Sequence, residues 1–506
     1  MTPLIGVAGL AGAGSLKSIQ GGVENWFLKF RYSDDVYGSL QYSASATSIH
    51  LDSSGNIFYT GIFQGGHSFV SKWDSNGNYQ WGVRLMKNSL SIMDVATDSS
   101  NNIYLVGYGS VSSHGNSGNE LLTIKLNSSG VRQWARAITD SGSSSQFGWK
   151  IVVDSSDDIY VCGQTYHPTG SSGNSYYLYA KYNSSGAIQY QRYYHTQTGN
   201  GANHSAKAMV ITGGTSGNDM WIGGSAWLYR TTDYGSYSYS RTVPNLMKFD
   251  KSTGTPHGSG SGYSKIFYVP GEACSGRQDM AAYSNDVFYV SDITYTYNYS
   301  TFYSLLVTRV NSSGDEQWTR IIGKDHGGTT SNGVNVYGGA IDVDNSGNVY
   351  VMGRTRPYNT YQDGMLIVKY NSSGVLQWQR TFDGSSIEQA EGSLIKHDNN
   401  GNFYIGFMSQ TPLGGGQGNE TFILAKLPDD GSKTGTHGVF TYAASSYSDT
   451  PRSSHAYLNY FTPPSDTDYY GTLNETNTIY YYDSTDTLSE HTIPSSTFNP
   501  TFTAIE

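Results

Sequence analysis

Asp52-Ser-Ser-Gly-Asn-Ile-Phe-Tyr-Thr-Gly61 is the stretch of sequence that decides the fold, because the chain repeats it. Adjacent copies lie 46 residues apart from Asp52 to Asp98 and 54 residues apart from Asp344 to Asp398. Repeats of this length indicate a solenoid, a propeller or an array rather than unrelated domains. Seven copies can be counted, and they begin at Asp52, Asp98, Asp154, Ser216, Ser284, Asp344 and Asp398.

Each copy predicts a strand, a tight turn and a second strand. Asp and Asn bond their own backbone and Gly accepts positive φ, so Asp-x-Ser-Gly-Asn is a turn between two apolar runs. A second hairpin follows in each unit: Leu122–Arg136 matches Leu366–Arg380 almost position for position, with Asn-Ser-Ser-Gly at its centre. Seven units of four short antiparallel strands predict an all-β fold, a seven-bladed β-propeller.

The repeat resembles that of a known family. Asp-x-x-Gly-Asn-Ile/Val-Tyr-Val-x-Gly followed by Lys-Tyr/Leu-Asn-x-x-Gly is similar to the SBBP repeat of seven-bladed β-propeller proteins, whose relatives occur in bacterial surface proteins and phage structural proteins. The likeness spans roughly residues 22–445. It implies the propeller fold, but a propeller is a scaffold that hosts unrelated activities.

The repeat divides the chain into three parts. We expect an N-terminal Gly/Ala-rich arm (1–21), the propeller (22–445) and a β-rich C-terminal extension (446–506). The extension is too aromatic for a disordered tail, so we expect it to dock on the propeller or on another subunit. Ahead of the first Asp turn, Trp26–Phe30 resembles an unpaired half-unit that either closes a seven-bladed ring or caps an eighth, incomplete blade.

Composition excludes several classes of protein. The net charge is −10 and the chain has no Lys/Arg run, so we predict no nucleic-acid partner. No apolar stretch reaches the length of a membrane helix, so we predict no membrane insertion. Met1–Gly14 lacks the basic region of an export signal, so the sequence favours a protein that is not exported by that route.

The sequence contains no catalytic or metal-binding motif that we can assign. The Asp turns group oxygen atoms as calcium loops do, but the full loop pattern with its distal Glu is absent. His-Glu-x-x-His and Gly-x-Ser-x-Gly are absent as well. Asp383, Glu388 and Glu391 form the densest acidic group and are typical of a solvated loop. We therefore predict no cofactor, no metal and no catalytic residue.

A recurring aromatic residue in the second hairpin predicts packing between blades. Every blade must bury one face against its neighbour, whereas a ligand site rarely needs the same aromatic at symmetric places. The residues at this position are Trp81, Trp134, Trp318, Trp378 and, in the third unit, Tyr190.

Tyrosines gather in the loops between the second and third strands of units three to five. Tyr mixed with Ser and Gly is the chemistry of adaptable binding loops. The alternative is that alternating Tyr and Ser simply extends each hairpin beyond its blade. The candidate binding residues are Tyr166, Tyr176, Tyr177, Trp227, Tyr229, Tyr234, Tyr237, Tyr239, Tyr295, Tyr297, Tyr299 and Tyr303.

These features favour a non-enzymatic virion component, in a bacteriophage tail or surface appendage, with the propeller as a platform for host attachment. Its partners would be other virion subunits, contacted through the two terminal arms, and a host-surface glycan or protein. The alternative is an exported, lectin-like or adhesive protein of the bacterial surface. A third interpretation, a glycan hydrolase or lyase, needs carboxylates around the central mouth of the ring.

Overall fold

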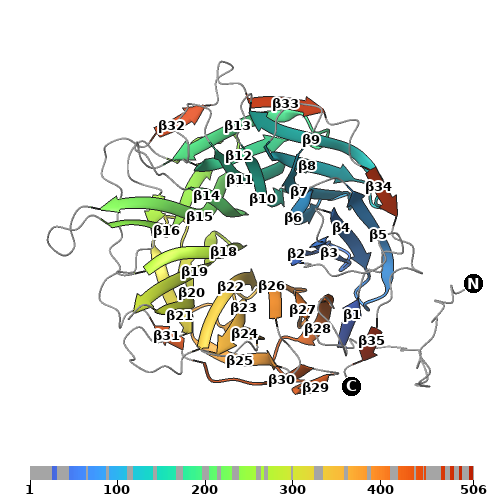
Figure 1. The fold of residues 1–506 in the computed structure, drawn as a ribbon, viewed down its shortest axis with the longest axis vertical. Coiled ribbons are helices and arrows are strands. Elements are labelled where there is room, and N and C mark those ends of the chain that lie inside the picture. The colour runs from blue at the N-terminus through green and yellow to red at the C-terminus, as the bar shows by residue number, and fades with distance from the viewer. Residues whose placement is uncertain are drawn as a thin grey trace, which may run out of the picture.

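The chain folds as a ring of seven antiparallel β-sheets, which are the blades of a β-propeller (Figure 1). The computed structural model describes residues 25–30, 45–63, 67–86, 90–110, 118–140, 145–166, 175–195, 204–212, 218–230, 239–257, 264–266, 272–297, 300–323, 334–357, 363–383, 389–410, 420–437, 440–447, 449–451, 469–472, 479–483, 489–492 and 501–504. These residues contain no helix, and hence none that could cross a membrane. The predicted all-β propeller with seven blades is confirmed.

Six blades are each built from four consecutive strands, ordered from the centre of the ring outward. The first three blades are β2 (Ser45–Leu51), β3 (Ile57–Phe63), β4 (His67–Trp73) and β5 (Tyr79–Met86); β6 (Ser91–Thr97), β7 (Ile103–Gly109), β8 (Glu120–Leu126) and β9 (Arg132–Asp140); and β10 (Gln146–Val153), β11 (Ile159–Tyr166), β12 (Ser175–Tyr182) and β13 (Ile188–His195). The next three are β14 (Ser205–Thr212), β15 (Asp219–Arg230), β16 (Tyr239–Asp250) and β17 (Ser264–Ile266); β18 (Glu272–Tyr283), β19 (Asp286–Tyr297), β20 (Ser300–Val310) and β21 (Glu316–Gly323); and β22 (Val334–Val343), β23 (Val349–Pro357), β24 (Gly364–Tyr370) and β25 (Leu376–Asp383).

The seventh blade joins the two ends of the repeat region. Three of its strands come from the last unit: β26 (Gln389–His397), β27 (Asn402–Gln410) and β28 (Glu420–Pro428). The fourth is β1 (Trp26–Phe30), which pairs antiparallel with β28 from Trp26↔Lys426 to Phe30↔Phe422. The unpaired N-terminal half-unit therefore closes a seven-bladed ring, and no eighth blade is present among the described residues.

The C-terminal extension wraps the outside of the ring. After β29 (Gly435–His437), β30 (Phe440–Ala444) pairs with β25 of the sixth blade. The following strands pair with the outer strands of the fifth, third, second, first and seventh blades: β31 (Asp449–Pro451), β32 (Tyr469–Thr472), β33 (Ile479–Asp483), β34 (Ser489–Thr492) and β35 (Thr501–Ala504). Figure 1 shows these red strands around the perimeter, in the reverse order of the blades. The described strands of the extension thus dock on the propeller itself.

The repeated Asp turn is a self-contained hydrogen-bonding unit. Asp52 Oδ1 accepts from the backbone N–H of Ser54 at 2.9 Å and of Asn56 at 2.8 Å, and Oδ2 accepts from the Asn56 side-chain amide at 2.8 Å. Gly55 between them has φ +76°, where a Cβ would be strained. The same bonds recur at Asp98, Asp344 and Asp398. The turn satisfies its own hydrogen-bonding groups, which explains why the Asp-x-Ser-Gly-Asn pattern recurs along the sequence.

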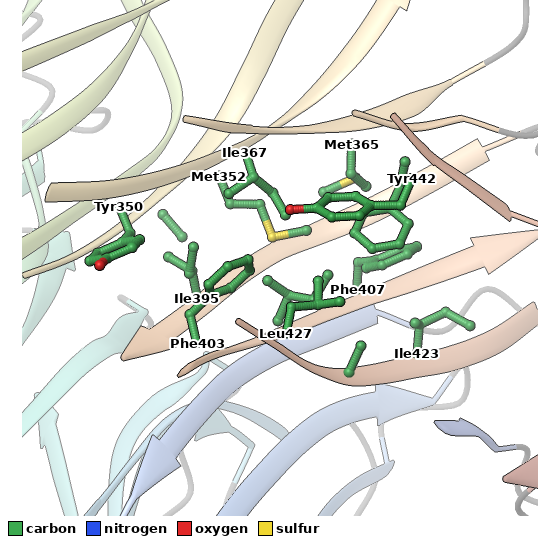
Figure 2. Close-up of a cluster of buried hydrophobic side chains, with 14 of the residues drawn as sticks. Tyr350, Met352, Met365, Ile367, Ile395, Phe403, Phe407, Ile423, Leu427 and Tyr442 are labelled. Carbon is green, nitrogen blue, oxygen red and sulfur yellow. The ribbon is translucent and has the colours of Figure 1, made fainter. Parts of the chain in front are cut away.

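The hydrophobic core lies between the faces of neighbouring blades. Figure 2 shows one such interface, in which Tyr350, Met352 and Ile367 of the sixth blade face Phe403 and Phe407 of the seventh. All five side chains are buried. Six further clusters of this kind occur among the described residues, so the ring is stabilised by contacts between successive blades rather than by one central core.

Among the described residues, the recurring aromatic residue clamps six of the seven blades to the next one. The indole N–H of Trp318 donates to Ser372 O of the following blade at 3.0 Å, and its ring packs on Gly374, where a Cβ would lie 2.6 Å from the ring. The equivalent pairs are Trp26–Gly77, Trp81–Gly130, Trp134–Gly186, Tyr190–Gly254 and Trp378–Gly431. The predicted packing between blades is confirmed, although Trp81, Trp134, Trp318 and Trp378 are half-buried rather than fully buried.

We expect Trp378→Ala to lower the free energy of unfolding by about 2 kcal/mol, roughly half the cost of deleting a fully buried aromatic side chain. The variant loses the contact with Gly431 and the hydrogen bond from Trp378 Nε1 to Asp429 O. Chemical denaturation of the purified chain measures the change. Asn127→Asp is the control, because the carboxylate keeps the acceptor of the turn and Asp74 fills the same role in the first blade. Equal stability of Trp378→Ala and Asn127→Asp would contradict the clamp.

Candidate functional site

The innermost strand of every blade carries a β-bulge at the same level of the ring. The register shifts occur at Ala46/Ser48, Ile92/Asp94, Gly148/Lys150, Ala206/Ala208, Cys274/Gln278, Tyr337/Ala340 and Glu391/Leu394. A bulge inserts an extra residue and redirects the side chains around it. Six of the inserted residues line the same central cavity: Thr47, Met93, Trp149, Lys207, Gly276 and Arg277.

This cavity has a volume of about 300 Å³ and lies on the axis of the ring. Charged side chains from five different blades line it: Asp94, Lys150, Lys207, Arg277, Asp279 and Lys396. Polar groups in the middle of an innermost strand are costly unless they are paired or face a ligand or solvent. The lining of the cavity is therefore much richer in charged side chains than the blade interfaces are.

Side chains cross the centre of the ring and connect blades that are not neighbours. Lys150 of the third blade lies 3.0 Å from Asp279 of the fifth and 3.6 Å from Asp94 of the second. Arg277 of the fifth blade donates from Nη2 to Thr47 O of the first blade at 2.9 Å. The opening that the ribbon leaves at the centre of Figure 1 is consequently bridged by polar contacts.

These contacts favour the ionised form of the Asp279 carboxyl group. Burial alone would raise the pKa of Asp279, but Lys150, Lys396 and Arg277 outweigh burial and lower it. Asp94 accepts from Ser48 Oγ at 2.5 Å and from the backbone N–H of Ile151 at 3.0 Å. A glycosidase needs one carboxyl group that holds its proton near neutral pH. The lowered pKa of Asp279 does not suit that role.

Asp292 is a buried carboxyl group directly behind the cavity wall. Burial raises its pKa to about 7, although the backbone N–H groups of Gly338 and Arg277 donate to it at 2.8 and 3.2 Å. The side chain is 3% exposed and faces this backbone rather than the cavity. Gly276, with φ +88°, is required beside it, because a Cβ there would lie 2.2 Å from Asp292 Oδ2. The geometry gives Asp292 a structural role.

The Asp turns offer few ligand atoms to a metal ion. In four of them both carboxylate oxygens already accept hydrogen bonds from the turn's own backbone and Asn side chain. In the fifth, Asp154 Oδ2 accepts from Lys251 Nζ at 2.8 Å. A calcium ion would have to compete with these donors for the same lone pairs.

One group of side chains in the described structure is close enough to hold a metal ion: Asp344, His397 and Asp429. His397 Nδ1 accepts from the backbone N–H of Asn399 at 2.9 Å, so the proton of the neutral ring is on Nε2, which donates to Asp429 Oδ2 at 3.0 Å. Tyr350 OH lies 3.1 Å from a carboxylate oxygen of each Asp. With both ring nitrogens engaged, the cluster links the sixth and seventh blades by hydrogen bonds and does not fit a metal.

The structure separates the predicted binding tyrosines into three groups. Tyr176 and Tyr177 are 8% and 1% exposed, so the prediction that they are surface contacts is wrong: they lie on β12, and Tyr177 belongs to a core cluster. Tyr166 is 37% exposed at the end of β11, and Tyr303 is half-buried on β20. Trp227, Tyr229, Tyr239, Tyr295 and Tyr297 lie on extended strands, and Tyr234, Tyr237 and Tyr299 lie outside the described residues.

The hairpins of the fourth and fifth blades are longer than the others. β15 and β16 pair from Asp219↔Asp250 out to Arg230↔Tyr239, and β19 and β20 pair out to Tyr297↔Ser300. Figure 1 shows β15 and β16 reaching further outward than the strands of the neighbouring blades. The described tyrosines of this region, Tyr229, Tyr239, Tyr295 and Tyr297, therefore lie on strands that extend the hairpins.

Sequence reasoning missed the central cavity. A usable signal exists, since Asp94 and Lys150 both stand four residues before the Asp of their turn, in a strand that is otherwise apolar or small. The bulge that shifts register just before this position is not visible in the sequence. The acidic group predicted as a loop is also divided: Asp383 ends β25, Glu391 lies on β26, and Glu388 is outside the described residues.

Comparisons with known proteins bear on the fold. The family model for the SBBP beta-propeller repeat matches residues 317–356. No curated protein matches the chain. Among solved structures, the plexin A4 extracellular region is 8% identical with a TM-score of 0.40, over 77% of this chain and 51% of that one. The WD40 domain of SCAP from fission yeast is 8% identical with a TM-score of 0.34, over 77% and 98%.

An apocarotenoid oxygenase from Synechocystis is also similar, with 8% identity and a TM-score of 0.35, over 64% of this chain and 68% of that one. These structures differ in function, and this degree of similarity supports no functional argument. The chain covers only about half of the plexin A4 region that it resembles. Together, the repeat match and the seven blades identify the chain as a seven-bladed β-propeller that carries the SBBP repeat.

Proposed function

We propose that the chain is a non-enzymatic structural component of a virion, in a bacteriophage tail or surface appendage, in which the propeller is an interaction platform. The observation that carries this proposal is the pair of long hairpins on the neighbouring fourth and fifth blades. They place Tyr229, Tyr239, Tyr295 and Tyr297 on strands that continue rigid blades.

A strand-borne tyrosine suits recognition for an energetic reason. A tyrosine ring offers a large contact area with only two side-chain torsions to fix, so it loses little conformational entropy on binding. The polar residues next to these tyrosines, such as Ser240, Thr294 and Thr296, supply hydrogen-bonding groups. The two long hairpins, β15–β16 and β19–β20, form the hairpin sector. They combine a preorganised backbone with side chains that can adapt their hydrogen bonds, which suits attachment to an outside target.

The other features of the molecule are consistent with this proposal. The ion pair with Lys150 favours the anionic form of Asp279 in the cavity, which favours binding over acid–base catalysis. The virion setting rests on the resemblance of the repeat to that of phage structural proteins, and the partners proposed for the terminal arms are other subunits of the particle.

The hairpin sector is tested by replacing Trp227, Tyr229, Tyr239 and Tyr297 together with Ser. We expect particles that contain the variant at the normal level, measured by mass spectrometry of purified virions, but at least tenfold slower adsorption to host cells. The control replaces the exposed Val131 and Val375, which lie in tight turns of the second and sixth blades, with Ser. Absence of the chain from purified particles, or normal adsorption by the hairpin variant, would refute the proposal.

The N-terminal arm has a separate test. Deletion of residues 1–20 leaves β1 intact, because that strand begins at Trp26, so the variant should fold and melt like the full chain. If the arm joins the propeller to another subunit, the variant should be missing from purified particles. Normal incorporation of the shortened chain would exclude the arm as an assembly contact.

A further inference from the structure

The guanidinium group of Arg277 lines the central cavity, and the fold uses only part of its hydrogen-bonding capacity. Arg277 has five N–H donors, of which one goes to Thr47 O at 2.9 Å. Among the described residues, no carboxylate is within ion-pair distance of this side chain, although Asp279, Asp94 and Asp292 are near enough to influence its pKa. The planar fork of a guanidinium matches the two oxygens of a carboxylate.

Trp149 provides an apolar surface on the same cavity. Its indole Nε1 is buried and has no acceptor among the described residues. Lys207 Nζ lies 6.0 Å from the centre of its ring and donates to Gly276 O at 2.6 Å, next to Arg277. The ring of Trp149 stacks on Phe147 at 6.0 Å, and Phe147 contacts the exposed Tyr166 at 6.1 Å. A strip of aromatic rings thus leads from the surface to the cavity.

The charge at the centre of the ring is opposite in sign to that of the whole chain. Four basic side chains, Lys150, Lys207, Arg277 and Lys396, gather there with three carboxylates, Asp94, Asp279 and Asp342. Burial, together with Lys396 and Lys150, lowers the pKa of His50 to about 3, so this neighbouring ring stays neutral. Among the described side chains these groups sum to one excess positive charge when the Asp292 carboxyl group holds its proton, in a chain whose net charge is −10. Such a local excess attracts a singly charged anion.

We infer that the cavity binds one carboxylate-bearing sugar residue of a glycan. The carboxylate would be held by Arg277 and Lys207, and the apolar face of the sugar ring would pack on Trp149. A volume of about 300 Å³ is at the small end of ligand pockets and suits a single sugar residue. This site is separate from the two long hairpins and does not depend on the virion setting.

The test uses calorimetric titration of the full chain with methyl glucuronide and methyl galacturonide, and with their neutral counterparts methyl glucoside and methyl galactoside. We expect at least one acidic sugar to bind at least tenfold more tightly than its neutral counterpart. Arg277→Gln keeps a donor for Thr47 O but removes the charge, and should weaken that binding at least tenfold. Lys207→Gln should weaken it to a similar degree, and Trp149→Phe should weaken it several-fold.

Lys433→Gln is the matched control, because it makes the same charge change at an exposed turn far from the cavity. Melting curves establish that each variant is folded. Failure of both acidic sugars to bind, or unchanged binding by a folded Arg277→Gln chain, would overturn the inference. Inorganic phosphate that binds as tightly as the acidic sugar would overturn the assignment to a saccharide, since the sugar ring would then add nothing. The hairpin variant tested above should bind the acidic sugar normally, which separates this result from the proposed function.

Discussion

Trp26→Ala is expected to destabilise the protein by about 3 to 5 kcal/mol, the cost of deleting a large side chain from a packed interior. Trp26 is 2% exposed and lies in the cluster between the seventh and first blades, with its ring 5.9 Å from that of Tyr404. Its indole N–H donates to Ser75 O of the first blade at 3.3 Å. The residue therefore acts on ring closure as well as on local packing.

The consequence of losing this contact is larger than at the other blade interfaces. In the first six blades the four strands follow one another in the chain, whereas the seventh blade is completed by β1, from the other end of the repeat region, which pairs with β28 through backbone hydrogen bonds. If β1 detaches, β28 loses its partner and two blade faces become exposed together. Urea unfolding of Trp26→Ala, with the exposed Val375→Ala as the control, measures the effect. Equal stability of the two variants would show that Trp26 does not secure the closure.

The repeat could be predicted from sequence because its signal is local. In each Asp turn the carboxylate binds backbone N–H groups two and four residues ahead, so the whole signal lies within five positions, with Asn101 and Asp157 adopting the positive φ that Gly adopts in the other turns. The recurring Trp could be assigned to packing for a similar reason, since its partner is always the Gly of the next hairpin. Fold and blade number follow from interactions of this kind.

Features that depend on closure of the ring could not be predicted in the same way. Lys150 and Asp279 are 129 residues apart in the chain, and they meet only because the third and fifth blades face one centre. The strands of the C-terminal extension pair through their backbone with the outer edges of distant blades, and backbone pairing leaves no repeated sequence pattern. The prediction for Tyr176 and Tyr177 was wrong because both stand near the start of β12. In the sequence, only amino-acid composition marks where the preceding loop ends and this strand begins.

The second prediction with a large expected effect concerns the pH dependence of stability at Asp292. Burial raises the pKa of Asp292 to about 7 in the folded protein, whereas an unfolded Asp has a pKa of about 3.9. Between these values the folded state holds a proton that the unfolded state has lost, so stability falls as the pH rises. The contribution is fully present below pH ~4 and is lost by pH ~8. Three pH units at about 1.4 kcal/mol each correspond to about 4 kcal/mol.

Asp292→Asn removes this titration while keeping a side chain of the same size. The amide oxygen can still accept from the Gly338 N–H, but the amide nitrogen would face the N–H of Arg277, so the variant carries a constant penalty of about 1 to 3 kcal/mol. Relative to the original chain, the variant should therefore gain about 4 kcal/mol between pH ~4 and pH ~8, measured by urea unfolding at several pH values.

Asp98→Asn is the matched control for this titration. Although burial opposes it, the hydrogen bonds from Asn102 lower the pKa of Asp98, so its contribution to stability is present above the unfolded pKa and is lost only as the pH falls below that range. The difference between Asp98→Asn and the original chain should consequently be flat from pH ~5 to pH ~8. If the Asp292→Asn difference is equally flat over that interval, Asp292 is ionised in the folded protein and its carboxylate must be stabilised by the positive charge of the adjacent cavity.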